Sequence, residues 1–150
     1  MGKDRIGNKM TFWDKVFRQF KTDFNITPHF KYSEFHCKDG TVYPYNWVDD
    51  RLLELCEQLE IIREFADAPI IINSGYRTYA YNKEVGGVDT SMHLLGKAVD
   101  IRAVGVPISS LYKKIYYLRK QGRIKKGGIG FYSTFIHYDT RGKNVTWRKR

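Results

Sequence analysis

The sequence predicts an α+β domain in which helices pack around a small antiparallel β-sheet. Stretches with apolar residues three or four positions apart are interrupted by short runs rich in β-branched residues, and strand-like runs joined by turns fill the last part of the chain. The chain has 150 residues, of which 42% are hydrophobic and 15% aromatic, so it can form one buried core. We expect a single domain over residues 1–150.

The first predicted element is an amphipathic helix over residues 11–22. Its apolar residues recur at helical spacing, with Lys15, Arg18, Gln19 and Lys21 off the stripe; they are Phe12, Trp13, Val16, Phe17 and Phe20. A basic amphipathic helix can also lie on a membrane surface. We expect residues 1–24 to pack on the domain instead.

The middle of the chain alternates irregular, helical and strand-like segments. Residues 25–46 are rich in turn formers and aromatic residues and predict mainly irregular structure. Asn46 is a candidate cap for a helix that runs to about Ala66, with an inner face of Leu52, Leu55, Leu59 and Ile62. The run PIIINS (69–74) indicates a buried strand. GYRTYAYNKEVGG (75–87) then predicts a loop, a short helix and a glycine stop.

The second half of the chain continues this alternation. Residues 96–102 alternate as a strand, and residues 107–121 have helical spacing that ends at Gly122. The segment from 127 to 147 indicates strands joined by turns at 133–134 and 141–142.

Two of the predicted strands carry residues that could bind a metal. Alternate residues of a strand share a face, so His137 and Asp139 lie on one face with Phe135, while Asp100 lies opposite its aliphatic neighbours. If the two strands are neighbours, Asp100 and His137 converge, and His93 can join them from the preceding loop. Two imidazoles and one carboxylate leave a fourth tetrahedral position open, as in catalytic zinc sites. From the spacing alone, polar residues that bind no metal are the favoured explanation, because a single His is more often a hydrogen-bonded polar residue than a metal ligand.

Three segments resemble the zinc D-Ala-D-Ala carboxypeptidase family of peptidoglycan peptidases, which includes murein endopeptidases and phage endolysins. They are SGYRT (74–78), YNKEVGGVDTSMHLLGKAVDI (81–101) and GGIGFYSTFIHYDTRG (127–142). The motif S-x-H-x-x-G-x-A-x-D is complete in Ser91, His93, Gly96, Ala98 and Asp100.

The resemblance implies a fold, a metal and a reaction. The fold would be the small one shared with the hedgehog signalling domain. Zn²⁺ would be held by His93, Asp100 and His137, and Arg77 and Ser91 would bind substrate. Ser91 could also order the ligand loop. The reaction implied is hydrolysis of an amide bond in the stem peptide or the cross-link of peptidoglycan.

The sequence offers several candidates for the general base. Many relatives have an acidic residue three positions before the last His, where this chain has Thr134. Asp139 is the candidate, either as the base or as an acceptor that orients a ligand imidazole. Glu84 and Asp89 are further candidates. The alternative function is a catalytically silent metal domain that binds the cell wall.

The charge and the remaining residues set expectations about partners and location. The net charge of +10, concentrated around residues 113–126 and at the C-terminus, implies attraction to a polyanion: nucleic acid, an anionic membrane or an anionic cell wall. The family resemblance favours the wall, and no nucleic-acid-binding motif is present. We expect a monomer with peptidoglycan as partner and no transmembrane segment. Without a signal peptide, we expect synthesis in the cytoplasm and action at the bacterial wall, as in a phage lysis or entry enzyme. His29 and His36 are expected not to bind metal, and Cys37 and Cys56 are expected to be free thiols.

Overall fold

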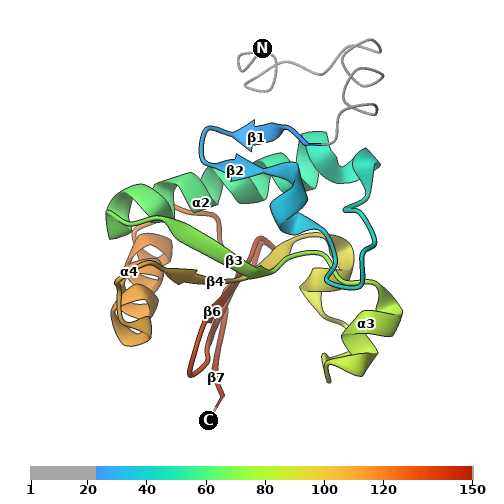
Figure 1. Ribbon diagram of the computed structural model, residues 1–150. Coiled ribbons are helices and arrows are strands. Elements are labelled where there is room, and N and C mark those ends of the chain that lie inside the picture. Colours follow the sequence, from blue (N-terminus) through green and yellow to red (C-terminus); the bar gives the residue numbers. More distant parts are fainter. Residues whose placement is uncertain (1–22, 150) are drawn as a thin grey trace.

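The computed structural model describes residues 23–149, and Figure 1 shows their arrangement. The amphipathic helix predicted over residues 11–22 lies outside the described residues. The elements follow the order β1 (Asn25–Thr27), β2 (Phe30–Lys31), the 3-10 helices η2 (Tyr32–Phe35) and η3 (Tyr45–Trp47), the π-helix η4 (Val48–Leu52), α2 (Leu53–Ala66), β3 (Ile70–Ser74), α3 (Tyr79–Glu84), the 3-10 helix η5 (Met92–Leu95), β4 (Ala98–Ala103), α4 (Ile108–Lys120), β5 (Gly128–Phe131), β6 (Ile136–Asp139) and β7 (Val145–Arg148). The α+β class is confirmed.

Five strands form the main sheet, in the order β3-β4-β6-β5-β7. The first four pair antiparallel, as predicted, but β7 pairs parallel with β5. Because β5 and β6 are antiparallel, β6 ends beside the start of β5. The chain turns there, and β7 then runs along β5 in the same direction. The expectation of a purely antiparallel sheet is therefore wrong for its last pair.

The segment before α2 differs from its prediction in two ways. Residues 25–31, expected to be irregular, form a short hairpin of β1 and β2. Asn46 does not cap the following helix, because the chain already enters a 3-10 turn after Pro44, and Asn46 lies inside that turn. Three helical geometries then follow without interruption as far as Ala66, where the predicted helix ends.

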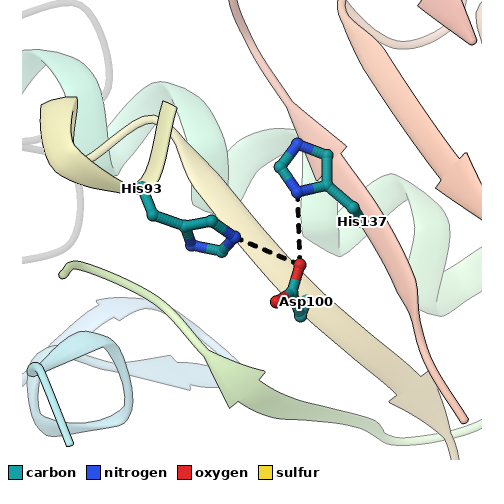
Figure 2. Close-up of side chains that lie close together, drawn as sticks. All are labelled: His93, Asp100 and His137. Atoms are coloured by element: carbon teal, nitrogen blue, oxygen red, sulfur yellow. Dashed lines mark hydrogen bonds and ion pairs between the residues drawn. The ribbon is translucent and has the colours of Figure 1, made fainter. Parts of the chain in front are cut away.

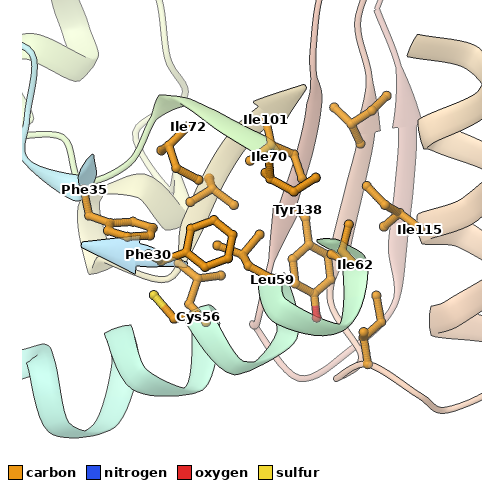
Figure 3. Close-up of a cluster of buried hydrophobic side chains, with 14 of the residues drawn as sticks. Phe30, Phe35, Cys56, Leu59, Ile62, Ile70, Ile72, Ile101, Ile115 and Tyr138 are labelled. Atoms are coloured by element: carbon orange, nitrogen blue, oxygen red, sulfur yellow. The ribbon is translucent and has the colours of Figure 1, made fainter. Parts of the chain in front are cut away.

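The helices α2 and α4 cover one face of the sheet, and this face contains the core (Figure 3). Their inner residues are fully buried, as predicted for α2; they are Leu55, Leu59 and Ile62 of α2 and Leu111, Ile115 and Leu118 of α4. They pack with Ile101 of β4 and with Ile136 and Tyr138 of β6. Burial of these apolar groups fixes which face of β4 and β6 points away from the helices.

No helix among residues 23–149 is long and apolar enough to cross a membrane.

Candidate metal centre

Asp100 and His137 lie directly opposite each other on neighbouring strands. The register pairs Asp100 of β4 with His137 of β6, and the aliphatic residues on either side of Asp100 face the core. Both polar side chains therefore point away from α2 and α4, and His137 Nδ1 lies 3.2 Å from Asp100 Oδ1. The sequence predicted that Asp100 and His137 converge if their strands are neighbours. The pairing of β4 with β6 fulfils this condition.

His93 approaches from the 3-10 helix η5, between β3 and β4. The Ser91 hydroxyl accepts a hydrogen bond from the His93 backbone N–H (3.2 Å) and so caps η5. Gly96 ends η5 with a φ of 68°, and a Cβ there would lie 2.6 Å from the Tyr43 hydroxyl, so glycine is required by both conformation and space. This turn directs His93 Nε2 to within 3.1 Å of Asp100 Oδ1 (Figure 2).

The three side chains offer one cluster of metal-binding atoms. One atom from each residue lies within 4.8 Å of the other two, and all three residues are buried. Ligand atoms 2.0–2.2 Å from a tetrahedral zinc ion lie roughly 3.3–3.6 Å apart. The two distances to Asp100 Oδ1, 3.1 and 3.2 Å, are close to this spacing.

Hydrogen bonds behind the two imidazoles fix their tautomers. His93 Nδ1 lies 2.7 Å from the carbonyl oxygen of Gly75, which can only accept, so Nδ1 carries the proton. His137 Nε2 lies 2.7 Å from Asp139 Oδ2, and the carboxylate again accepts. In each neutral ring the lone pair is therefore left on the nitrogen that faces Asp100.

This arrangement places three acceptors against one another. Two imidazole lone pairs and a carboxylate oxygen repel unless a proton or a metal cation lies between them. Burial lowers the pKa of His93, which favours its neutral form. Burial also acts to lower the pKa of His137, but hydrogen bonds to Asp100 and Asp139 outweigh it and raise the pKa above its usual value. The potential ligand atoms, two imidazole nitrogens and a carboxylate oxygen, are of the types that bind zinc.

Asp100 itself is held in the charged form. Burial acts to raise its pKa, but hydrogen bonds from His137 and His93, when a proton lies between each ring and Asp100, outweigh burial and keep the pKa well below its usual range. Its second oxygen, Oδ2, accepts a hydrogen bond from Arg77 Nη2 at 3.1 Å. Oδ1 is thus the oxygen that faces both imidazoles.

Asp139, the candidate base, is saturated with hydrogen bonds. Its side chain is 0% exposed. Oδ1 accepts from the Gly128 N–H and from the backbone and Nε of Arg141, and Oδ2 accepts from His137 and from Arg141 Nη2. Five contacts use a carboxylate's roughly four lone-pair positions. A base must come within hydrogen-bond reach of the proton that it takes, and these contacts favour the orienting alternative for Asp139.

Of the remaining candidates, Arg77 contacts this cluster and the others are exposed. Arg77 contacts Asp100, as described, and its backbone N–H donates to the His93 carbonyl. Thr134, which replaces the acidic residue of many relatives, is exposed in the turn before β6. Glu84 and Asp89 are also exposed, at the end of α3 and in the loop that follows it.

Other residues important for the site were not predicted from the sequence. They are Gly75, whose carbonyl orients His93; Asn82, which accepts from Arg77 Nη1; Arg141, which pairs with Asp139; and Trp147, whose ring lies 4.9 Å from that of His137. Asn82 and Arg141 both lie in segments that carry the family resemblance. The role of a backbone carbonyl leaves no mark in residue type.

The other histidines and the cysteines lie elsewhere. His29 pairs with Glu60, and His36 accepts a hydrogen bond from the Tyr43 backbone. Cys37 and Cys56 are both buried, and neither forms a disulfide, as predicted.

Comparison with known proteins bears on this site. The family described as Peptidase M15 matches residues 28–139. A protein of Haemophilus influenzae named "Probable peptidoglycan L,D-endopeptidase MepK" is 29% identical over 122 residues, which are 77% of this chain and 62% of that protein. "Peptidoglycan L,D-endopeptidase MepK" of Escherichia coli K12 is 33% identical over 79 residues, 48% of this chain and 40% of that protein. The chain thus spans less than two thirds of the length of these curated relatives.

Proposed function

We propose, because this chain belongs to the peptidase M15 family, that it is a zinc-dependent peptidase that hydrolyses a peptide bond in bacterial peptidoglycan. The observation that carries the proposal is the convergence of His93, Asp100 and His137, whose potential ligand atoms lie within 4.8 Å of one another. The names of the relatives favour an L,D-endopeptidase among the bonds that the sequence left open.

The proposed ligand set is His93 Nε2, Asp100 Oδ1 and His137 Nδ1. A zinc ion held by three such ligands keeps a position for water, lowers the pKa of that water to about 7 and polarises a carbonyl group. The Gly75 carbonyl and Asp139 would keep the two imidazoles in the tautomers that bind metal. We assign Asp139 this orienting role, because its oxygens are already engaged.

Arg77 is proposed to bind a carboxylate of the substrate. Guanidinium has five N–H donors. Within residues 23–149, three of them reach acceptors: Nε contacts Ser74 Oγ, Nη1 contacts Asn82 Oδ1 and Nη2 contacts Asp100 Oδ2. One donor on each terminal nitrogen is left for a ligand. Peptidoglycan stem peptides have carboxylates close to the amide bonds that are cut, and a planar fork matches a carboxylate.

We expect Arg77→Lys to raise KM for a carboxylate-bearing peptidoglycan fragment about tenfold to a hundredfold, since one or two charge-assisted hydrogen bonds are worth roughly 1.5–3 kcal/mol each. The zinc content should be unchanged, because lysine keeps the positive charge beside Asp100. Steady-state kinetics and metal analysis measure the two quantities. Arg102→Lys, an exposed change on β4, the strand that contains Asp100, is the control and should leave KM and zinc content unaltered. An unchanged KM in Arg77→Lys would contradict the substrate role.

For Ser91, the contact with the His93 backbone supports the loop-ordering role more than a direct contact with substrate.

A catalytically silent metal domain that binds the wall is the second candidate. It is favoured by one observation: Thr134 takes the place of the acidic base of many relatives, and the nearby carboxylate of Asp139 is fully engaged. Such a protein would hold zinc and sediment with wall material without cutting it.

Incubation of purified sacculi with the full chain separates the two candidates. With zinc, we expect new peptide termini by mass spectrometry; with a chelator, we expect none, and added zinc should restore them. The Asp100→Ala variant serves as the inactive control. Zinc-loaded protein that sediments with sacculi but releases no new termini would rule out the peptidase and favour the silent domain.

Three earlier expectations stay predictions: that residues 1–150 form one domain with the N-terminal segment packed on it, that the protein is a monomer, and that it acts in phage lysis or entry.

A further inference from the structure

The net positive charge of the chain comes from its last third. Residues 101–150 contain 13 Lys or Arg and one acidic residue, a net charge of +12. Residues 1–100 contain 13 Lys or Arg and 15 Asp or Glu, a net charge of −2. The sequence has no acidic residue between Asp100 and Asp139. A division of this kind creates a positive potential over one part of the surface.

The outer face of α4 and the segment after it gather much of this charge. We call this surface the α4 face; its exposed residues are Lys113, Tyr116, Tyr117, Lys120, Arg123 and Lys126. Lys113 and Lys120 are seven residues apart on one helix, which is about 10 Å along its axis. The face therefore suits a series of anions along an extended molecule more than a single small anion.

Aromatic contacts hold part of the α4 face in place without neutralising it. Lys114 Nζ and Arg123 Cζ each lie 5.4 Å from the centre of the Phe65 ring, and Phe65 stacks on Tyr117 with 5.6 Å between ring centres. Cation–π contacts stabilise a charged side chain but leave its charge in place. Tyr117 is still 47% exposed, and Tyr116 is 40% exposed.

Carboxylates neutralise little of this charge. Between residues 113 and 126, the one ion pair with a described carboxylate joins Lys125 Nζ to Glu54 Oε1 at 2.9 Å. That pair is partly exposed on both sides, so it is worth little in water. The cations of the α4 face form no ion pair with a carboxylate of residues 23–149, so their N–H donors can bind an external anion.

The α4 face and the metal centre lie on opposite sides of the sheet. The buried residues of α4 pack against the core face of β4, β5 and β6, whereas Asp100 and His137 point away from that face. In Figure 1, α4 lies on one side of the sheet, and α3 and the segment with His93 lie on the other. A polymer bound along α4 would therefore leave the metal centre free.

We infer that the α4 face binds a cell-wall polymer with repeating phosphodiester groups. Lys and Arg bind phosphate oxygens through charge-assisted hydrogen bonds, and the exposed tyrosine rings offer flat surfaces for the polyol or sugar units between phosphates. Nucleic acid is disfavoured because the sequence has no recognised nucleic-acid-binding motif. The choice of a wall polymer rests on the proposed function; the binding surface itself does not.

Binding of fluorescently labelled poly(glycerol phosphate) to the full chain tests this inference. The variant K113Q/K120Q/R123Q should bind at least tenfold more weakly than wild type at about 0.1 M salt. The slope of log affinity against log salt should fall by about 2–3, since three cationic contacts no longer release counterions. The control K31Q/K38Q/K83Q removes the same charge from exposed sites elsewhere and should lose less than twofold.

Several results would overturn the inference. Equal losses in the two triple variants would mean that net charge alone attracts the polymer. Tighter binding to single-stranded DNA or to anionic lipid vesicles than to poly(glycerol phosphate) would assign the face to another partner. Because the measurement needs no cleavage, it is repeated with Asp100→Ala: full binding there supports a separate surface even if the proposed catalysis fails. Loss of binding in Asp100→Ala would place the polymer at the metal centre and refute the inference.

Discussion

Replacing Asp100 by Ala is expected to remove zinc from the protein and to abolish peptidoglycan cleavage. Asp100 Oδ1 is the atom that both His93 Nε2 and His137 Nδ1 approach, and it supplies the single negative charge among the three proposed ligands. Without it, two imidazoles on separate elements have no common partner. The loss of zinc affinity should exceed the ~10–100-fold that follows removal of an outer-shell partner.

His93→Ala and His137→Ala should have the same outcome as Asp100→Ala. Metal analysis of each purified variant, with activity on sacculi, measures the effect. His29→Ala and His36→Ala are matched controls, because they remove an imidazole away from the cluster, and they should retain full zinc. Full zinc occupancy in all three cluster variants would show that the ligand set is wrong.

Asp139→Asn is expected to weaken zinc binding by about 10–100-fold while the ligands themselves stay in place. The Asp139 carboxylate accepts a hydrogen bond from His137 Nε2–H and thereby leaves the Nδ1 lone pair for the metal. A neutral amide accepts this hydrogen bond more weakly and brings an NH₂ group against Arg141. Competition with a chromophoric chelator measures affinity, and nitrogen NMR of the imidazoles reports the tautomer. Asp89→Asn, on the exposed loop, is the control; unchanged affinity and tautomer in Asp139→Asn would refute the orienting role.

The same variant should alter the acid response of the metal-free protein. Burial acts to raise the pKa of Asp139, but hydrogen bonds from His137 and Arg141 outweigh it and lower the pKa. A carboxylate with a depressed pKa stabilises the fold above its unfolded value of about 3.9, and this contribution is lost as the pH falls through the lower folded value. The difference in unfolding free energy between wild type and Asp139→Asn should therefore be largest near neutral pH and shrink below about pH 4. Urea unfolding at a series of pH values measures it.

Most of the fold could be predicted from periodicity, because apolar spacing decides which face of an element is buried. The end of α2 at Ala66, the strand after Pro69 and the helix α4 all follow this rule. The start of the first long helix could not be predicted from a capping residue, since the 3-10 and π turns before α2 depend on packing in three dimensions.

The candidate site was predictable as a set of residues and less so as a mechanism. Strand alternation placed Asp100 and His137 on equivalent faces, but only the pairing of β4 with β6 brings them together. Whether Asp139 is a base or an orienting group depends on where Arg141 and Gly128 place their donors, and spacing along the chain does not contain that information.

The direct pairing of Asp100 with His137 has a consequence for how the sheet assembles. A slip of one residue between β4 and β6 would turn Ile136 or Tyr138 toward the position of the ion and bury a ligand among the aliphatic side chains. Only the native alignment can therefore capture the cation, and capture adds its binding free energy to that alignment alone. Zinc binding would in this way stabilise the native register selectively during folding. It would hold together two strands that are separated in the sequence by α4 and β5.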